Sequence, residues 1–334
     1  MMDIFTVLPT MFSDINRCMG AWGTAGQMDP FKNIYDLVFQ MTIRVGCCEE
    51  LATDPRAVQK ISDLYWQYEK GVTPMSLLLP WFPSTARKQK NQAIRGLYSM
   101  LSHHVDVRRK AKQLTSDAYD VLIAEGEDNA TIVEVYVTVT LLSWTLISHF
   151  VACVTNHICR RRQHGHDLSV VLTASFTAIS QMPHNSACWT LFYLGANHEW
   201  KQKVIGEIRY LISTYSHADS SEPMHQRLSA IPISAWEDET PILESVIRET
   251  LRLVKNGPAL RRNLADKLKV ADQAIDKGVF LVYNMGDVHM NEKFYAEPHK
   301  FDPDRYSAPR EEDKRGNMLF LAWGGGRHTC SGQF

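Results

Sequence analysis

Apolar residues recur at three- and four-residue steps along the first third of the chain, which is the spacing of amphipathic helices. Residues 34–45 show this pattern, and residues 58–68 repeat it after Asp54-Pro55, a helix start signal. A third predicted helix covers about Thr85 to Lys112, with many basic residues between its apolar positions. Such a basic run is more often a solvated face than a binding patch. The pattern therefore predicts a mainly helical region.

The pattern returns after residue 188. An apolar stripe over residues 200–211 predicts one helix, and residues 242–253 predict a stronger one. Between them, residues 214–239 are polar with two prolines, and we expect a loop there. Residues 260–263 and 279–283 indicate short strands around an Asp-Lys-Gly turn. The predicted fold class is mainly α with small β-sheets.

The segment between these regions has a different character. Residues 135–159 contain no Asp, Glu, Lys or Arg, and three arginines follow directly. Length and flanking charge make it a transmembrane candidate. A transmembrane span would, however, place the residues before and after it on opposite sides of a membrane and so divide a predicted single globular domain. A divergent buried helix and an inserted or mistranslated segment, residues 134–187, are the other two interpretations.

Composition narrows the function classes. The 334 residues carry a formal net charge of −1, which gives no electrostatic reason to expect nucleic acid. Apolar content of 45% and charged content of 22% are ordinary for a soluble globular protein. The seven cysteines form no disulfide or zinc-like framework, which suits a reducing compartment. Residues 1–28 have neither the basic start nor the apolar run of a signal peptide or anchor.

The most informative stretch runs from Trp323 to Gly332. Three consecutive glycines end at Gly326 and let the backbone turn tightly against a flat group. Cys330 follows four residues later, at the expected start of a helix whose dipole favours a thiolate. A cysteine presented in this way is a haem-iron ligand in one class of haem proteins. The alternative is a glycine-rich turn with a chance buried cysteine.

Two motifs precede this loop in a fixed order. Glu249 and Arg252 lie three residues apart on one face of the predicted helix 242–253 and can pair. A Phe-x-Pro-x-Arg segment containing Arg305 follows some fifty residues later. The three motifs and their spacing resemble those of cytochromes P450, with Trp323 where the family usually has Phe. The sequence pattern of residues 30–110 and 188–332 resembles that of fungal, sterol-demethylase-like members of the family.

The resemblance implies a partial P450 fold, a helical bundle around haem b with small β-sheets. It implies that Cys330 is the axial ligand of the haem iron and that Glu249, Arg252 and Arg305 form a charged triad. It further implies a monooxygenase that oxidises an apolar, lipid- or terpenoid-like molecule in secondary metabolism. Electrons would come from NADPH through a cytochrome P450 reductase docking near Arg310, Lys314, Arg315 and Arg327. The implied location is the cytoplasmic face of the endoplasmic reticulum membrane.

Further binding roles follow only from the resemblance. Arg262 and His328 stand where the family often places partners of the haem propionates, and His328 replaces a usual Arg. Trp323, Gly326 and Gly332 complete the cofactor-binding loop. For Arg262, a surface residue at a strand edge is the alternative.

The sequence also departs from the family. The distal helix usually carries an acid–alcohol pair that delivers protons, whereas residues 180–186 have none and include Pro183. His184, Asn185 and Ser186 are weak catalytic candidates that are also suited to a loop or helix cap. On the resemblance, we expect a chain truncated at both ends. An inactive P450 fragment and a P450-type isomerase or dehydratase therefore remain alternatives to the monooxygenase.

The expected organisation has four parts. Residues 1–29 are an undetermined N-terminal segment, and residues 30–133 are helical. Residues 134–187 are an anomalous insert that replaces the front of the distal helix. Residues 188–334 form the haem-binding part.

Overall fold

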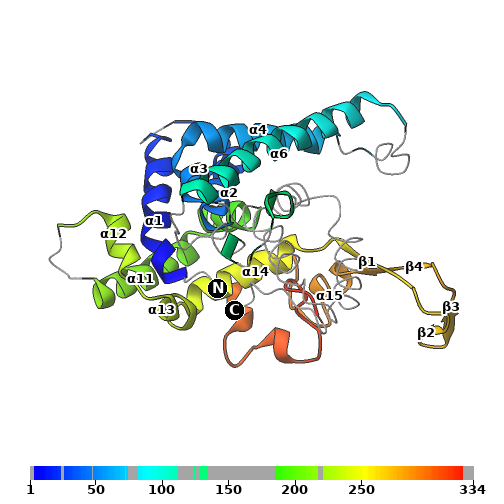
Figure 1. The fold of residues 1–334 in the computed structure, drawn as a ribbon. Coiled ribbons are helices and arrows are strands. Elements are labelled where there is room, and N and C mark those ends of the chain that lie inside the picture. The colour runs from blue at the N-terminus through cyan, green and yellow to red at the C-terminus, as the bar shows by residue number, and fades with distance from the viewer. Residues whose placement is uncertain are drawn as a thin grey trace. The chain divides into compact units, whose positions relative to one another are not determined.

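A computed structural model describes the chain over residues 4–23, 26–46, 48–71, 73, 82–111, 123–124, 126, 128–133, 185–216 and 221–325 (Figure 1). These residues divide into two compact units. The first unit holds the described residues up to 133, together with residue 185 and residues 222–229. The second unit holds the remaining described residues, from 186 onward.

The first unit is helical. Its helices are α1 (Ile4–Gly20), α2 (Pro30–Gly46), α3 (Glu49–Thr53), α4 (Pro55–Gly71), α6 (Thr85–Ala111) and α12 (Met224–Ser229). The three helices predicted between residues 30 and 112 correspond to α2, α4 and α6. Residues 1–29, for which the sequence predicts no particular element, contain α1. Pro9 lies inside α1 and interrupts the pattern by which a helix is recognised from sequence.

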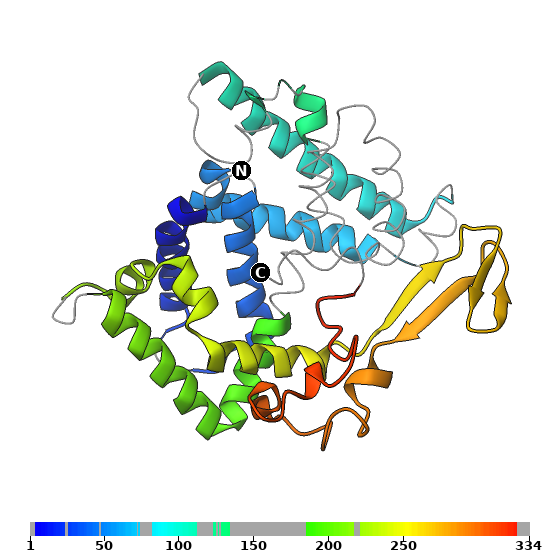
Figure 2. The same cartoon turned by 90° about the horizontal axis from the view of Figure 1, so that it is seen from below.

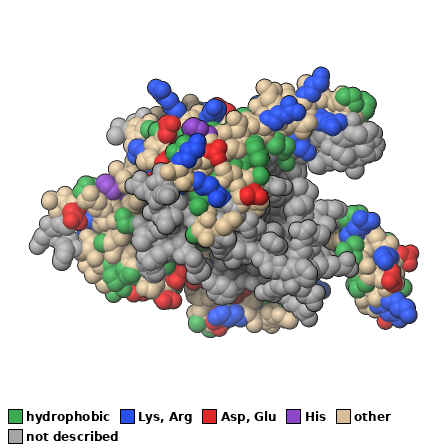
Figure 3. Space-filling view, in the orientation of Figure 1, with side chains coloured by type: hydrophobic (Ala, Val, Ile, Leu, Met, Phe, Trp, Pro, Cys, Tyr) green, Lys and Arg blue, Asp and Glu red, His purple; other side chains and the backbone are tan. Residues whose placement is uncertain are grey.

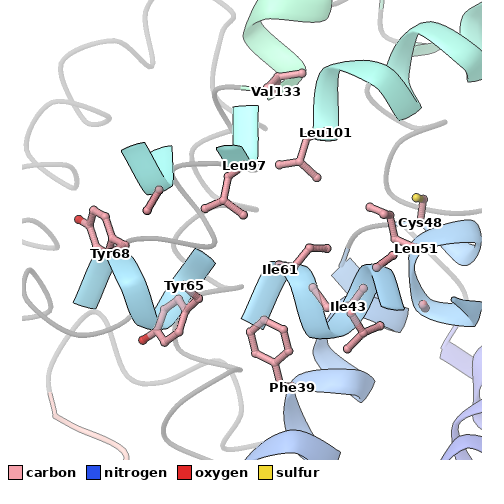
Figure 4. Close-up of a cluster of buried hydrophobic side chains, with 14 of the residues drawn as sticks. Phe39, Ile43, Cys48, Leu51, Ile61, Tyr65, Tyr68, Leu97, Leu101 and Val133 are labelled. Carbon is pink, nitrogen blue, oxygen red and sulfur yellow. The ribbon is translucent and has the colours of Figure 1, made fainter. Parts of the chain in front are cut away.

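The core of this unit lies between α2, α3, α4 and α6 (Figure 4). Ile43, Leu51, Ile61 and Leu97 are at most 2% exposed within it. Tyr35, Phe39 and Tyr65 add ring contacts, with the Tyr35 and Phe39 centroids 5.6 Å apart. Burial of apolar and aromatic side chains of this kind is the main favourable term in folding.

Helices α4 and α6 pack with their backbones close together. A Cβ atom on Gly71 would lie 2.7 Å from the Lys90 amide nitrogen, and one on Gly96 would lie 2.7 Å from a methyl carbon of Leu64. At Gly71 the clash would be with the backbone of α6, so only glycine fits there, whereas at Gly96 the flexible Leu64 side chain can shift. The close contact of these helices at Gly71 therefore requires glycine.

The second unit combines helices and two small sheets. Its first helix covers residues 186–196 and continues the helix that begins at residue 185, and α11 (His198–Tyr215), α13 (Ile233–Asp238), α14 (Pro241–Val254) and α15 (Gly286–His289) follow. Two 3₁₀ turns, η1 (Pro303–Tyr306) and η2 (Glu312–Lys314), come later. The loop expected over residues 214–239 is wrong in part, because α12 and α13 form there. Pro223 and Pro232 stand directly before these helices, so both prolines start a helix and do not only punctuate a loop.

Both sheets are two-stranded and antiparallel. Strand β1 (Pro258–Arg262) pairs with β4 (Phe280–Asn284), and β2 (Leu268–Val270) pairs with β3 (Gln273–Ile275). The two longer strands were predicted, and the hairpin β2–β3 at the far end of the ribbon was not (Figure 2). Its strands are three residues long, too short for an alternating pattern to be recognised.

The described surface shows mixed charge. In Figure 3 basic side chains gather over the region that α4 and α6 occupy in Figure 1, with acidic side chains among them. Among the helices that the structure describes, none is long and apolar enough to cross a membrane. The candidate span, residues 135–159, lies outside the described residues, as does nearly all of segment 134–187.

Candidate functional site

Helix α14 carries the first half of the site. Pro241 opens the helix, and Glu207 of α11 caps it from outside: its carboxylate accepts the amide N–H groups of Ile242 and Leu243, both at 2.8 Å. The first amides of a helix lack partners within it, and an anionic acceptor there is favourable. The start of α14 is thus fixed to α11.

Glu249 lies on the buried face of α14 and is the centre of a charged network. Arg252 donates to both carboxylate oxygens, from Nε and from a terminal nitrogen, each at 2.8 Å. Arg305 of η1 donates through Nε at 3.0 Å, and the Asp302 amide donates at 3.0 Å. The Tyr306 hydroxyl completes the set at 3.2 Å. The structure therefore brings together the three charged residues of the predicted triad, all of them 0% exposed.

Arg305 uses every N–H group of its guanidinium. Besides Glu249, it donates to the Glu312 carboxylate at 2.9 Å and to the Ala296 carbonyl. The remaining terminal nitrogen donates to the carbonyl oxygens of Glu297 and Lys300, both at 3.0 Å. A fully buried charge is tolerated when it is paired and its hydrogen bonds are satisfied. Arg305 meets both conditions.

The network perturbs the ionisation of its members. Burial alone would lower the pKa of Arg252, but its bonds to Glu249 raise that pKa above the ordinary value. Burial, together with the nearby Glu249 carboxylate, raises the pKa of Tyr306 far above its usual range. Burial opposes ionisation of Glu312, yet Arg310 and Arg305 hold the pKa of Glu312 below its usual range. In each of these three groups, the shift follows from burial and from the charged partner that the network places beside it.

The network continues toward the glycine run. A terminal nitrogen of Arg252 donates to the carbonyl oxygen of His289, the last residue of α15. The ring of His289 is fully buried and accepts the Leu321 amide N–H at 3.0 Å through Nε2. Two residues earlier, the Leu319 carbonyl accepts the Tyr295 hydroxyl at 2.9 Å. The segment that precedes the glycine run is thus attached to α14 and α15.

The first two glycines of the run lie within the described residues. Gly324 adopts a left-handed backbone with φ of 80°, and its amide donates to the Leu321 carbonyl at 2.9 Å. A Cβ on Gly325 would lie 2.8 Å from the Met318 sulfur. The left-handed backbone at Gly324 favours glycine, whereas at Gly325 the flexible Met318 side chain can shift.

The remaining predicted residues fall in different places. Trp323 is half-buried, whereas Gly326, His328, Cys330 and Gly332 lie outside the described residues. Arg262 is exposed at the end of β1, where its guanidinium stacks on Phe280 at 5.6 Å and donates to the Gly278 carbonyl.

The weak catalytic candidates lie at the start of a helix. His184 is outside the described residues, and Asn185 and Ser186 are half-buried in the first turn of helix 185–196. The Ser186 carbonyl accepts the Thr190 hydroxyl at 2.8 Å, an ordinary contact within a helix. Nothing in this geometry assigns a proton-relay role to these two residues.

Sequence reasoning missed several members of the network. Glu312, Tyr306 and the Asp302 amide bind it, and the latter two lie in the Phe-x-Pro-x-Arg segment that had already been singled out. His289 is a different case, because a single histidine in a short segment of mixed polar and apolar residues gives no signal of burial. Only the fold reveals it.

Haem is the group that the site chemistry implies, and the described residues agree with it as far as they extend. The chain enters the cysteine loop from a position fixed by His289 and Tyr295, with glycines where the backbone turns closely. Cys330 offers a thiolate donor of the kind that binds haem iron.

The comparisons with known proteins agree with this site. The family model of cytochrome P450 matches residues 174–334. The chain is 25% identical to cytochrome P450 monooxygenase AacuE of Aspergillus aculeatus, over 92% of this chain and 55% of that protein. It is 24% identical to cytochrome P450 monooxygenase nsrP of Aspergillus novofumigatus, over 97% and 56%. Sterol 14alpha-demethylase of Mycolicibacterium vanbaalenii is 23% identical, over 97% and 62%.

The retinoic acid-bound structure of cyanobacterial CYP120A1 shares the fold, with a TM-score of 0.67, 17% identity, and coverage of 98% of this chain and 63% of that one. The fold and the site define a mainly helical protein in which a buried charged network leads to a glycine-rich segment before a cysteine. Residues 174–334 of the chain match the cytochrome P450 family, and nearly the whole chain is similar to cytochrome P450 monooxygenases. It spans somewhat more than half the length of the curated relatives described above.

Proposed function

We propose that this chain is the haem-carrying part of a haem-thiolate monooxygenase that oxidises an apolar small molecule of lipid- or terpenoid-like character. The observation that carries the proposal is the buried network of Glu249, Arg252 and Arg305, which continues through His289 to the entrance of the Cys330 loop. The P450-type cysteine motif and the buried Glu249 network belong to the same unit of the chain.

The residues of this chain have distinct roles in the proposal. Cys330 supplies the thiolate ligand, while Trp323, Gly326 and Gly332 shape the loop against the porphyrin. Arg262 and His328 pair with the propionates, although Arg262 would have to leave the Phe280 ring to do so. Haem with a thiolate ligand activates dioxygen when two electrons are supplied, and the thiolate favours O–O cleavage.

The proposed electron source is NADPH, through a cytochrome P450 reductase at the endoplasmic reticulum membrane. Docking near Arg310, Lys314, Arg315 and Arg327 has limited electrostatic support. Arg310 pairs with Asp302 and Glu312 at 2.9 Å, and Lys314 pairs with Glu311 at 2.7 Å. Cations neutralised in this way attract an acidic partner weakly.

A P450-type isomerase or dehydratase is the second candidate. The observation that favours it is the sequence of residues 180–186, which lacks the acid–alcohol pair usual in monooxygenases of the family. Such an enzyme uses the same haem-thiolate group without a reductase. An inactive fragment is the third outcome to be tested.

Spectroscopy of the purified chain separates these functions. We expect a thiolate-type band in the reduced, carbon monoxide-bound difference spectrum of haem-reconstituted protein, and its loss in Cys330→Ala. Cys188→Ala is a matched control, because Cys188 is a buried cysteine in the same unit and should leave the band intact. Absence of the band in the unsubstituted chain would disprove haem-thiolate binding. A band without NADPH consumption, in the presence of reductase and apolar substrates, would favour the isomerase or the inactive fragment.

A further inference from the structure

The fully buried ring of His289 makes a hydrogen bond on each side. Nδ1 lies 3.2 Å from the carbonyl oxygen of Lys255, directly after α14. On the other side, Nε2 lies 3.0 Å from the Leu321 amide nitrogen. A carbonyl only accepts and an amide N–H only donates, so Nδ1 carries the proton and Nε2 is the acceptor. The surroundings therefore fix one tautomer of a neutral imidazole.

Neutrality agrees with the electrostatics of the position. Burial lowers the pKa of His289 to about 4, and the nearby charge of Arg252 acts in the same direction. The backbone of His289 is fixed as well, since its carbonyl accepts from Arg252. One residue thus joins the charged network, the end of α14 and the segment leading to the glycine run.

We propose that His289 is a positioning residue for the Cys330 loop. Its Nε2 accepts from Leu321, nine residues before the cysteine, while its Nδ1 donates to Lys255 at the end of α14. The imidazole ring therefore links Leu321 to the helix that carries Glu249. The loop then begins from a fixed point, and less conformational entropy is lost when the thiolate meets a ligand. This inference rests on the proposed function, because the position of the loop matters for activity only if Cys330 binds haem.

Two amide variants separate the two sides of the ring. In His289→Gln, the side-chain carbonyl reaches about as far as Nε2 and can accept the Leu321 N–H. In His289→Asn, the shorter amide reaches only the Nδ1 position, so it can donate to Lys255 and leaves Leu321 without its acceptor. Both variants are neutral amides, which makes them a matched pair.

The first readout needs no haem. Deuterium exchange is measured by mass spectrometry on peptides covering residues 319–325 of the full chain. Loss of a hydrogen bond worth about 1.4 kcal/mol corresponds to about tenfold faster exchange. We expect this acceleration at Leu321 in His289→Asn, and near-original exchange in His289→Gln. Tyr295→Phe removes the neighbouring bond to Leu319 and is expected to leave the Leu321 amide protected.

The second readout is the thiolate-type band after reconstitution with haem. We expect His289→Gln to retain most of the band and His289→Asn to lose it several-fold. Equal exchange or equal bands in the two variants would overturn the proposal. Failure of His289→Asn to fold, judged by circular dichroism, would also overturn it in favour of a purely structural role.

These outcomes are distinguishable from failure of the proposed function. If the unsubstituted chain forms no thiolate-type band, the haem assignment fails, while the exchange data still decide whether His289 holds Leu321. If the unsubstituted chain and His289→Asn form equal bands, the haem assignment stands and the positioning role is wrong.

Discussion

The two units of this protein are stabilised in contrasting ways. The core of the first unit spreads its apolar contacts over 17 buried residues, and a buried ion pair of this unit, Arg44 with Asp14 at 2.8 Å, lies outside that cluster. The second unit concentrates its buried polar contacts on Glu249, which accepts from Arg252, Arg305, Tyr306 and a backbone amide. A distributed core loses stability gradually when it is altered, whereas a network built on one carboxylate fails when that carboxylate is removed. The comparison yields four tests, given from the largest expected effect to the smallest.

Removal of the central carboxylate should have the largest effect. Glu249→Ala leaves Arg252 and Arg305 buried without their counter-charge, and we expect a loss of about 3–5 kcal/mol in the free energy of unfolding. Urea denaturation followed by circular dichroism measures this loss. Glu244→Ala on the same helix is the control, because Glu244 is mostly exposed and should change stability by about 0.5 kcal/mol or less. Equal losses in the two variants would contradict a network centred on Glu249.

Acidification should destabilise the second unit strongly through the fully buried His289, and the first unit less through the half-buried His104, whose pKa burial also lowers. The pKa of His289 is about 4 in the folded chain and about 6.5 when unfolded. Between these values the unfolded chain binds a proton that the folded chain does not, so stability falls as pH drops from 6.5 to 4. The expected loss is about 3 kcal/mol.

The first unit has no matching loss in that range from Glu50. Arg108 lowers the pKa of Glu50 to about 2, so this contribution fades only below pH 4.5, and solvent exposure of the Glu50 carboxylate keeps it small. Urea unfolding at a series of pH values tests the difference. The His289→Gln variant should lack the slope between pH 6.5 and 4, and a slope unchanged in that variant would assign the effect elsewhere.

A substitution that keeps the charge should have an intermediate effect. Lysine in place of Arg305 retains the positive charge but offers three donors where arginine offers five, so carbonyl oxygens of residues 296–300 lose partners. We expect a loss of about 2 kcal/mol from these unmade bonds. The shift in urea midpoint is compared with that of Arg310→Lys, at the partly exposed rim of the network. A larger midpoint shift in Arg310→Lys than in Arg305→Lys would show that the extra hydrogen bonds of Arg305 contribute little to stability.

The smallest effect is expected in the apolar core. Ile61→Val removes one methylene from a side chain that is 1% exposed, at a cost of about 1 kcal/mol. Thermal unfolding measures the change, with Val107→Ala on the half-exposed face of α6 as the control. A loss comparable to that of Glu249→Ala would show that the first unit is no more tolerant than the second.

Much of this arrangement was predictable from local signals. Helices α2, α4, α6 and α14 follow from apolar periodicity, whereas the meeting of Glu249 with Arg305 was predicted from the resemblance of two motifs, 56 residues apart, to those of cytochromes P450. The roles of Cys330 and His328, and the nature of residues 134–187, remain predictions. Long-range partners such as Glu207 and His289 could not be predicted, because their contacts depend on packing that no spacing in the sequence encodes. Pro9 in α1 shows the opposite failure, in which the packed chain accommodates a residue that local preference disfavours.

The order of the chain gives the Glu249 network a consequence for biosynthesis. Glu249 and Arg252 leave the ribosome together, but Arg305 follows 56 residues after Glu249, a delay of roughly 3–11 seconds at ordinary elongation rates. Until then the carboxylate has one of its two cationic partners, and α14 cannot be buried without a large desolvation cost. We therefore expect nascent chains stalled between these residues to keep α14 accessible to protease, and chaperones to be needed mainly in that interval.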